Sequence, residues 1–258
     1  LPYDTGVQVT PYIIQVISNH NSPYSVPSGT PLIDVNVYPA AQSGPPSGTV
    51  TITSPIQIYA FDGSFNPSPT GGDCTQIGTW DAGTKTCTLT ADIVTSGNIA
   101  AIKLNQSIWQ SGFTGEGTTE SITIDGAGHT ITGDSGNTQI AVAIQNTAFT
   151  TVKNLVIENF YNGIHASQSY GITITGNTVR NSGSGPINVY DPSQGTGVLI
   201  SDNTIQDSAG GITVQGFIGN ESCTGSVNNA FLPAYSSIHP VIIKDNTITG
   251  GNSWGMQI

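Results

Sequence analysis

One short pattern repeats through the C-terminal half of the chain, and it constrains the fold more than any other feature. Three copies read ITITGNTV, VLISDNTI and VIIKDNTI, and they place Asn177, Asn203 and Asn246 at the same position. An apolar residue follows each Asn after two positions, and a second apolar alternation follows after nine or ten. A period in the twenties that is built from short alternating strands is typical of a solenoid.

Two looser copies precede these three. We align His129 and Asn154 with the three Asn residues, so that successive intervals are 25, 23, 26 and 43 residues. In the first copy, Ile140 and Val142 supply the second apolar alternation. The last interval fits one coil plus an insertion at 217–240. Asn tolerates left-handed backbone and bonds neighbouring backbone at turns, and stacked Asn side chains can bond one another. We therefore predict that these five anchors form a structural turn column.

The apolar alternations explain why the copies must stack. A period of two puts alternate side chains on one face of a strand, and one coil cannot cover that face alone. Stacked coils can, because strands lie about 4.8 Å apart and inward Ile and Val columns fill a dry interior. The predicted fold is all-β, a parallel β-helix of about five three-strand coils plus a cap. We expect Ile124, Ile174, Ile200 and Ile243 to lie near one inward column.

The pattern resembles the right-handed parallel β-helix proteins of the pectate-lyase-like superfamily. It is most similar to the NosD-like and carbohydrate-binding β-helix repeats of archaeal and bacterial surface proteins. The segments CTLTADI (87–93) and SITIDGAGHTITG (121–133) look like the opening of such domains, and the resemblance covers residues 71–258. It implies a fold but no single activity, because these repeats occur in lyases, hydrolases, adhesins and structural proteins.

Residues 1–70 do not share the repeat. They contain three strand-like runs separated by stretches of Pro, Gly and Ser, at 12–18, 31–38 and 49–61. We predict a β-rich N-terminal extension here, and two interpretations stay open: a small sandwich-like piece, or an arm that donates a strand to another subunit. The β-helix then occupies 71–258, with its cap or a zeroth coil at 89–110.

The cysteines suggest a disulfide. Cys74 and Cys87 flank TQIGTWDAGTKT, which reads as a strand, an Asp-Ala-Gly turn and a strand back. A hairpin would bring both cysteines close enough to bond, which implies an oxidising compartment. Cys223 is left over, and it is buried, reduced or paired between chains.

Composition and charge point to the outside of the cell. A net charge of −11 argues against nucleic acid or an anionic membrane surface as partner, and no apolar run approaches the ~20 residues that cross a bilayer. The chain begins at Leu1, which fits a secreted protein without its signal peptide and equally a trimmed fragment. Asn105 and Asn220 begin Asn-x-Ser sequons that permit glycosylation. We predict an extracellular or cell-surface location.

Two sets of polar residues are weak candidates for a metal site. Glu158, Asn181 and Asp207 each lie four residues past an anchor, whereas Asp202 and Asp245 directly precede anchors on adjacent coils. Carboxylates stacked about 5 Å apart repel one another, and a bound Ca²⁺ would relieve the repulsion. Solvated turn positions are the commoner explanation of such residues, so no cofactor is expected.

The sequence offers no catalytic set. Polysaccharide lyases of this superfamily pair an acidic calcium cluster with an Arg or Lys base, and hydrolases use several nearby carboxylates. Here Arg180 stands alone, and the paired Asp-Asp and Gly-His-Gly elements of polygalacturonases are missing. The histidines are too scattered for a copper site, at His20, His129, His165 and His239. Several aromatic residues could stack on sugars or simply line turns, since they do not align at one repeat position: Trp109, Tyr161, Tyr170, Tyr190 and Trp254.

The remaining features concern assembly. Within the 217–240 insertion, Glu221, Phe231 and Tyr235 would be contact residues unless the loop simply packs on the wall. Met256 and Ile258 lie on the third strand of the fifth coil with no cap after them, and such an edge invites another chain. We predict a secreted, non-enzymatic protein that builds a filament or surface layer from copies of itself by head-to-tail contacts. The alternative is a protein that binds or degrades extracellular polysaccharide.

Overall fold

The structure is a computed structural model of the 258-residue chain. The residues that it describes are 12–17, 34–39, 47–60, 68–97, 99–105, 121–134, 139–145, 147, 149–169, 171–190, 197–215, 241–251 and 255–257. The chain divides into two compact units, Leu1–Gly44 and Pro45–Ile258. In the first unit, β1 (Tyr12–Ile17) pairs antiparallel with β2 (Asp34–Pro39).

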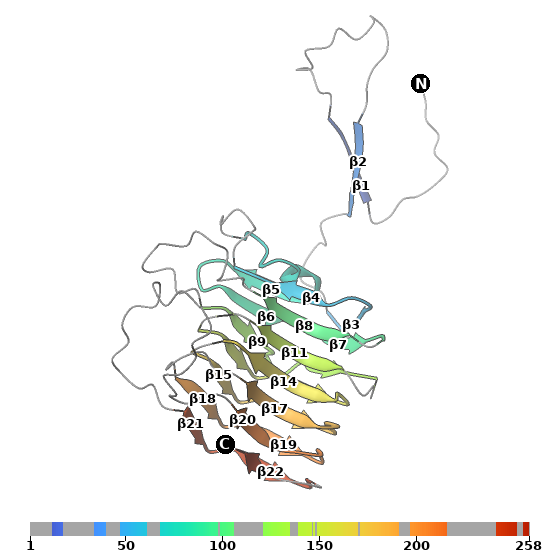
Figure 1. Cartoon of the computed structure of the whole chain (residues 1–258). Helices are drawn as coiled ribbons and strands as arrows, with labels where there is room; N and C mark the ends of the chain where they lie inside the picture. Colours follow the sequence, from blue (N-terminus) through green and yellow to red (C-terminus); the bar gives the residue numbers. More distant parts are fainter. Residues whose placement is uncertain are drawn as a thin grey trace, which may run out of the picture. The chain divides into compact units, whose positions relative to one another are not determined.

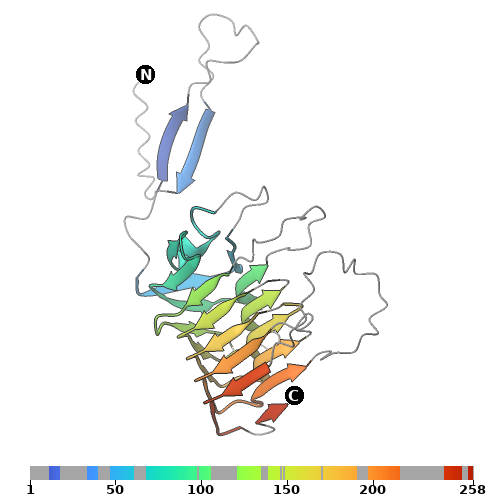
Figure 2. The same ribbon diagram turned by 90° about the vertical axis from the view of Figure 1, so that its left-hand side faces the viewer.

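The second unit is a solenoid of three sheets with seven strands each (Figures 1 and 2). The first sheet contains β5 (Gly78–Asp81), β6 (Thr86–Leu89), β9 (Thr123–Asp125), β12 (Thr151–Lys153), β15 (Thr173–Thr175), β18 (Val198–Ser201) and β21 (Val241–Lys244). The second contains β3 (Thr49–Ile52), β7 (Asp92–Thr95), β10 (Thr130–Thr132), β13 (Val156–Glu158), β16 (Thr178–Arg180), β19 (Thr204–Gln206) and β22 (Thr247–Thr249). The third contains β4 (Ile56–Ile58), β8 (Ala100–Asn105), β11 (Ile140–Gln145), β14 (Asn162–Ser167), β17 (Gly185–Tyr190), β20 (Ile212–Gln215) and β23 (Met256–Gln257).

Each coil adds one strand to every sheet in turn, and neighbouring strands run parallel except β5 and β6. The predicted all-β parallel β-helix is confirmed. Ile124, Val152, Ile174, Ile200 and Ile243 stand in register on the first sheet. The first four are fully buried, and Ile243 in the last coil is half-buried. The inward column that the sequence predicts is therefore present.

The solenoid begins earlier in the chain than the sequence analysis places it. β3 and β4 pair with β7 and β8, so residues that we assigned to the 1–70 extension belong to the β-helix, and 71–258 is too short a range. Ile52, Ile56 and Ile58 are buried in the same core. This segment has the period-two apolar pairs but no Asn turn, and an alignment anchored on Asn therefore misses it.

The described part of the predicted cap or zeroth coil at 89–110 belongs to a full coil. β6, β7 and β8 each pair with a strand of the following coil, so six consecutive coils of the described chain supply all three sheets.

The second apolar alternation of the first looser copy lies two residues further along the chain than the sequence analysis places it. Val142 and Ile144, rather than Ile140 and Val142, stand in register with Ile164 and Ala166.

The N-terminal end of the solenoid is closed by residues 68–81. A short 3-10 helix, η1 (Cys74–Gln76), precedes β5, which adds to the first sheet in the antiparallel direction. Cys74 is joined to Cys87 in a disulfide, as the sequence predicts. The indole N–H of Trp80 donates to the backbone carbonyl of Ser68 over 3.0 Å. These contacts hold the segment against the core.

The C-terminal coil is open by comparison. Val241, Ile243 and Ile248 continue the core columns but are only partly buried. Ile242 and Met256 expose 43% and 48% of their surface, and no further strand of the described chain pairs with β21, β22 or β23. Among the described residues, no helix has the length and apolar character to span a membrane.

Candidate functional sites

A ladder of three Asn side chains runs along the turn between the first and second sheets. The Asn177 backbone N–H donates to Oδ1 of Asn203, and the Asn203 N–H donates to Oδ1 of Asn246, both over 3.0 Å. The Nδ2 groups also donate along the ladder or to carbonyls of the preceding coil. Asn177 and Asn203 are each 1% exposed. Because the side-chain amides of all three residues bond within the stack, the role of these residues is structural.

Two of the five predicted anchors do not join the ladder. Leu155 occupies the ladder position in its coil and donates its N–H to Oδ1 of Asn177, while Asn154 lies one residue before it. His129 precedes β10 at the matching position, after a turn that is longer by two residues. Its Nδ1 lies 3.0 Å from a carboxylate oxygen of Asp92. The assignment of Asn154 to the column is wrong because the sequence Asn-Leu-Val offers two equally apolar registers.

The residues that directly precede the ladder share a left-handed backbone. Asn154, Asp202 and Asp245 have φ of 56°, 58° and 56°, and Gly176 lies in the same column with φ 67°. Such φ values favour Gly, Asn and Asp over other residues. The turn geometry alone therefore explains why Asp202 and Asp245 stack on adjacent coils.

The second acidic set is split by the true register. Glu158 lies opposite Arg180 on the next strand and forms an ion pair with it, so Glu158 and Asp207 do not share a column. Asp207 instead follows Asn181 at another left-handed position, with φ of 47° and 54°. Within the described ranges no three His, Cys, Asp or Glu residues are grouped closely enough to hold a metal ion.

A polar row crosses the third sheet on the face turned away from the core. His165, Asn188 and Thr213 stand in register on β14, β17 and β20, between residues that belong to the core. The His165 Nδ1 and Thr213 Oγ1 atoms are buried, and neither has a hydrogen-bond partner in the described part of the chain. The ring of Tyr190 lies 5.3 Å from that of His165 at an interplanar angle of 35°. We call these four residues the third-sheet row.

The third-sheet row is neutral in character. Burial lowers the pKa of His165 below its ordinary value of 6.5, which favours the uncharged imidazole near neutral pH. The Asn188 amide donates to the side-chain oxygen of Asn162 over 3.0 Å, so its orientation is held. The sequence did not reveal this row, because its positions hold a different residue type in every coil. Only the register brings them together.

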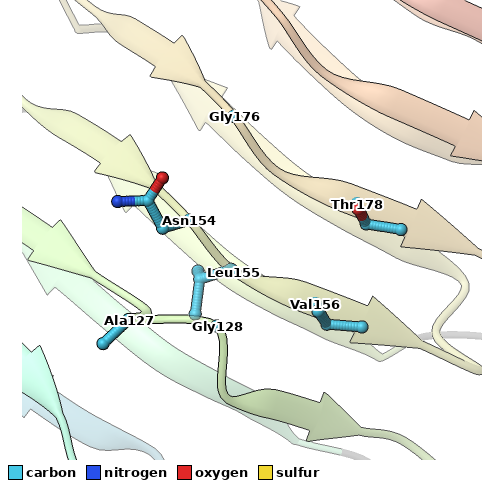
Figure 3. A pocket seen from close by; sticks show the side chains of 7 residues that line it. All are labelled: Ala127, Gly128, Asn154, Leu155, Val156, Gly176 and Thr178. Atoms are coloured by element: carbon cyan, nitrogen blue, oxygen red, sulfur yellow. The ribbon is translucent and has the colours of Figure 1, made fainter.

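A shallow hollow of about 380 Å³ lies where the longer turn before β10 meets the next coil. Figure 3 shows its lining by Ala127, Gly128, Asn154, Leu155, Val156, Gly176 and Thr178. None of these side chains titrates, and Asn154 donates to Asp125 beside the ion pair between Lys153 and Asp125. The hollow therefore has no ionisable side chain in its lining.

Several predicted residues lie outside the described residues: Asn220, Cys223, Ile258, His20, His239, Trp109, Tyr170, Trp254 and the 217–240 insertion with Glu221, Phe231 and Tyr235. The backbone of Asn105 ends β8, and its side chain is likewise outside the description. Of the predicted aromatic face, Tyr161 is on a turn and Tyr190 is on a strand, so these two do not share a column.

Comparison with known proteins supports the fold. A family model described as the right handed beta helix region matches residues 122–258, more than half of the chain. No curated protein and no solved structure matches the chain. The match covers the five coils from β9 to β23.

Proposed function

The chain belongs to the right-handed β-helix family, and from this premise we propose that it is a secreted, non-enzymatic structural protein that polymerises end to end. Proteins with this domain are often surface or polysaccharide-related. In the proposed assembly, the open edge of the last coil is covered by another copy of the chain. The product is an extracellular filament or layer, because a head-to-tail contact that does not close on itself continues indefinitely.

The observation that carries the proposal is a backbone N–H on the last coil that lacks, among the described residues, the acceptor its equivalents have in earlier coils. In earlier coils the turn residue donates its N–H to the following coil: Gly176 to Ser201 over 3.2 Å, and Asp202 to Lys244 over 3.3 Å. The equivalent N–H of Asp245 has no such acceptor in the described part of the chain. An exposed edge of this kind is a template for pairing with another chain.

The surroundings of the charged side chains agree with a structural role. Glu158 pairs with Arg180, and Asp125 pairs with Lys153 over 3.0 Å. Both pairs join neighbouring coils on an outer face of the solenoid. We therefore assign these groups to coil-to-coil register rather than to acid–base chemistry.

Electron microscopy and sedimentation of the purified natural full-length protein test the proposal. We expect regular polymers whose amount rises with protein concentration. Ile243→Lys should abolish them, because an inward-pointing charge at a sheet edge blocks pairing. Ile242→Lys is the matched control, since it adds the same charge to the neighbouring outward position and should leave the polymers intact. A wild-type protein that stays monomeric at all concentrations, or equal behaviour of the two variants, would overturn the proposal.

A second candidate function is glycan binding at the third-sheet row. The supporting observation is that His165 Nδ1 and Thr213 Oγ1 are buried with no hydrogen-bond partner among the described residues, and that the Tyr190 ring lies beside His165. Buried polar atoms normally have partners, and sugar hydroxyls with an apolar ring face suit such a set. Titration against a panel of neutral and acidic oligosaccharides tests it. The double variant His165→Ala/Thr213→Val should lose binding, whereas Gln206→Ala on the second sheet should not. If no glycan in the panel binds the wild-type protein, this function is excluded.

A further inference from the structure

We propose that the N-terminal hairpin of one copy adds to the first sheet of the next copy, with β2 antiparallel to β21. This inference rests on the proposed function, because it names the segment that covers the open end. It assigns the donor to the unit Leu1–Gly44, whose described residues form two paired strands. An isolated two-stranded hairpin is at best marginally stable in water, so such a unit gains by joining a larger sheet.

The register of the hairpin puts apolar residues on one of its faces. Ile14 lies opposite Val37, and Val16 lies opposite Val35. Because side chains alternate along a strand, these four positions share one face. The sequence pattern thus gives the paired strands an apolar face, which in the proposed contact lies on the same side as the core of the next copy.

The open end of the solenoid offers a surface with the same spacing. On β21, Val241 and Ile243 continue the inward column two residues apart and are only partly buried. Val35 and Val37 on β2 have the same separation. If β2 pairs antiparallel with β21 so that Val35 faces Ile243, then Val37 faces Val241. The hairpin would thus extend the core by further strands.

The same register brings opposite charges together. With Val35 facing Ile243, Asp34 faces Lys244, which exposes 56% of its side chain and lies 3.9 Å from Asp245 at the surface. Opposite charges directly across two strands stabilise their pairing, whereas a slip by one residue would remove that contact and turn Val35 and Val37 outward. One alignment therefore satisfies the apolar and the charged positions at once.

The other end of the molecule shows that an antiparallel strand can finish this parallel sheet. β5 is the first strand of the first sheet, and it pairs antiparallel with β6 from Gly78 opposite Leu89 to Asp81 opposite Thr86. The proposed β2–β21 pairing would close the opposite edge of the same sheet in the same way. Both ends of the first sheet would then carry an antiparallel terminal strand.

Cross-linking of mixed variants tests the contact in the natural full-length chain. Asn36 would face Ile242, and two cysteines at directly opposite strand positions are close enough for a disulfide. We would mix Asn36→Cys protein with Ile242→Cys protein, both carrying Cys223→Ala, and oxidise the mixture mildly. Mixed dimers on a non-reducing gel are the expected result. Thr173→Cys, in the same outward row two coils away, replaces Ile242→Cys as the control and should not cross-link.

A charge exchange adds a second measurement. Asp34→Lys should raise the critical concentration for polymerisation about threefold, and Asp34→Lys/Lys244→Asp should restore it. Wild-type polymers without mixed cross-links and without an effect of Asp34→Lys would overturn the hairpin contact and leave end-to-end assembly standing. A monomeric wild-type protein, as expected if further coils of the natural chain cover β21, would overturn both.

Discussion

The two ends of the described solenoid are built from the same three sheets, and they differ in how far the hydrophobic core is covered. At the N-terminal end, a non-repetitive segment covers the core, and its own Cys74 and Ile77 are fully buried. At the C-terminal end, Ile243 and Ile248 stand in the same columns as buried residues but remain partly exposed. The comparison shows that a repeat specifies how a coil continues and says nothing about how it ends. Termination requires sequence that breaks the repeat.

The largest expected effect comes from placing one carboxylate at equivalent positions of a middle and an end coil. Ile200→Asp should lower the free energy of unfolding by about 4 kcal/mol or more, because a charge in the dry core is unpaired. Ile243→Asp in the half-buried end column should cost about 1 kcal/mol, since water reaches it. Urea denaturation followed by circular dichroism measures both. Equal losses would mean that the last coil is as well packed as the middle.

The next effect concerns the closed end. Replacing both cysteines, Cys74→Ala/Cys87→Ala, should lower the free energy of unfolding by about 3 kcal/mol, because the short loop between them is freed in the unfolded chain. The measurement is urea denaturation under non-reducing conditions, and Cys223→Ala serves as the control with one thiol fewer. If dithiothreitol destabilises the double variant as much as the wild type, the disulfide does not stabilise this end.

A smaller effect separates two members of the Asn ladder. Asn203→Ala removes the acceptor of the buried Asn177 N–H and should cost about 2 kcal/mol, because that donor loses its partner. Asn246→Ala sits at the partly exposed end of the ladder, where water can replace it, and should cost less than about 1 kcal/mol. Thermal unfolding of the two variants, at concentrations too low for polymerisation, would show the ranking. The reverse order would mean that the end coil is covered even in the monomer.

The smallest effect is a pH dependence near the closed end. Asp92 accepts the backbone N–H of Thr130 over 2.9 Å, and this bond, with that to His129, lowers the pKa of its carboxyl below 3.8. Because the folded pKa is below the unfolded one, the stabilisation is present above the unfolded value and is lost as pH falls through the folded value. Between about pH 6 and pH 2, the urea midpoint should fall less in Asp92→Asn than in the wild type.

The control for that titration is Thr249→Ala on β22 at the open end, which changes no ionisable group. We expect this variant to follow the wild-type pH profile. A profile of Asp92→Asn that matches the wild type would contradict the role of the Asp92 hydrogen bonds.

The extent to which the sequence predicts the molecule depends on how regular each segment is. The first-sheet column through Ile124 and Ile200 follows from alternation alone and is confirmed. Asn154 was assigned one residue off the ladder, because Leu155 and Val156 are both apolar and only stacking decides which turns inward. β3 and β4 were left out of the solenoid, since they carry no Asn to mark their turn.

What the sequence by itself determined is the period, and with it the all-β solenoid, because an apolar residue at every second position must be covered and only stacked copies can cover it. Tertiary structure alone decided which residues meet between coils. His165, Asn188 and Thr213 come from three coils and share no motif, yet the register sets them in one row. The physical reason is that contacts across coils depend on the summed lengths of turns, and one residue more or less in a turn moves a side chain to the other face.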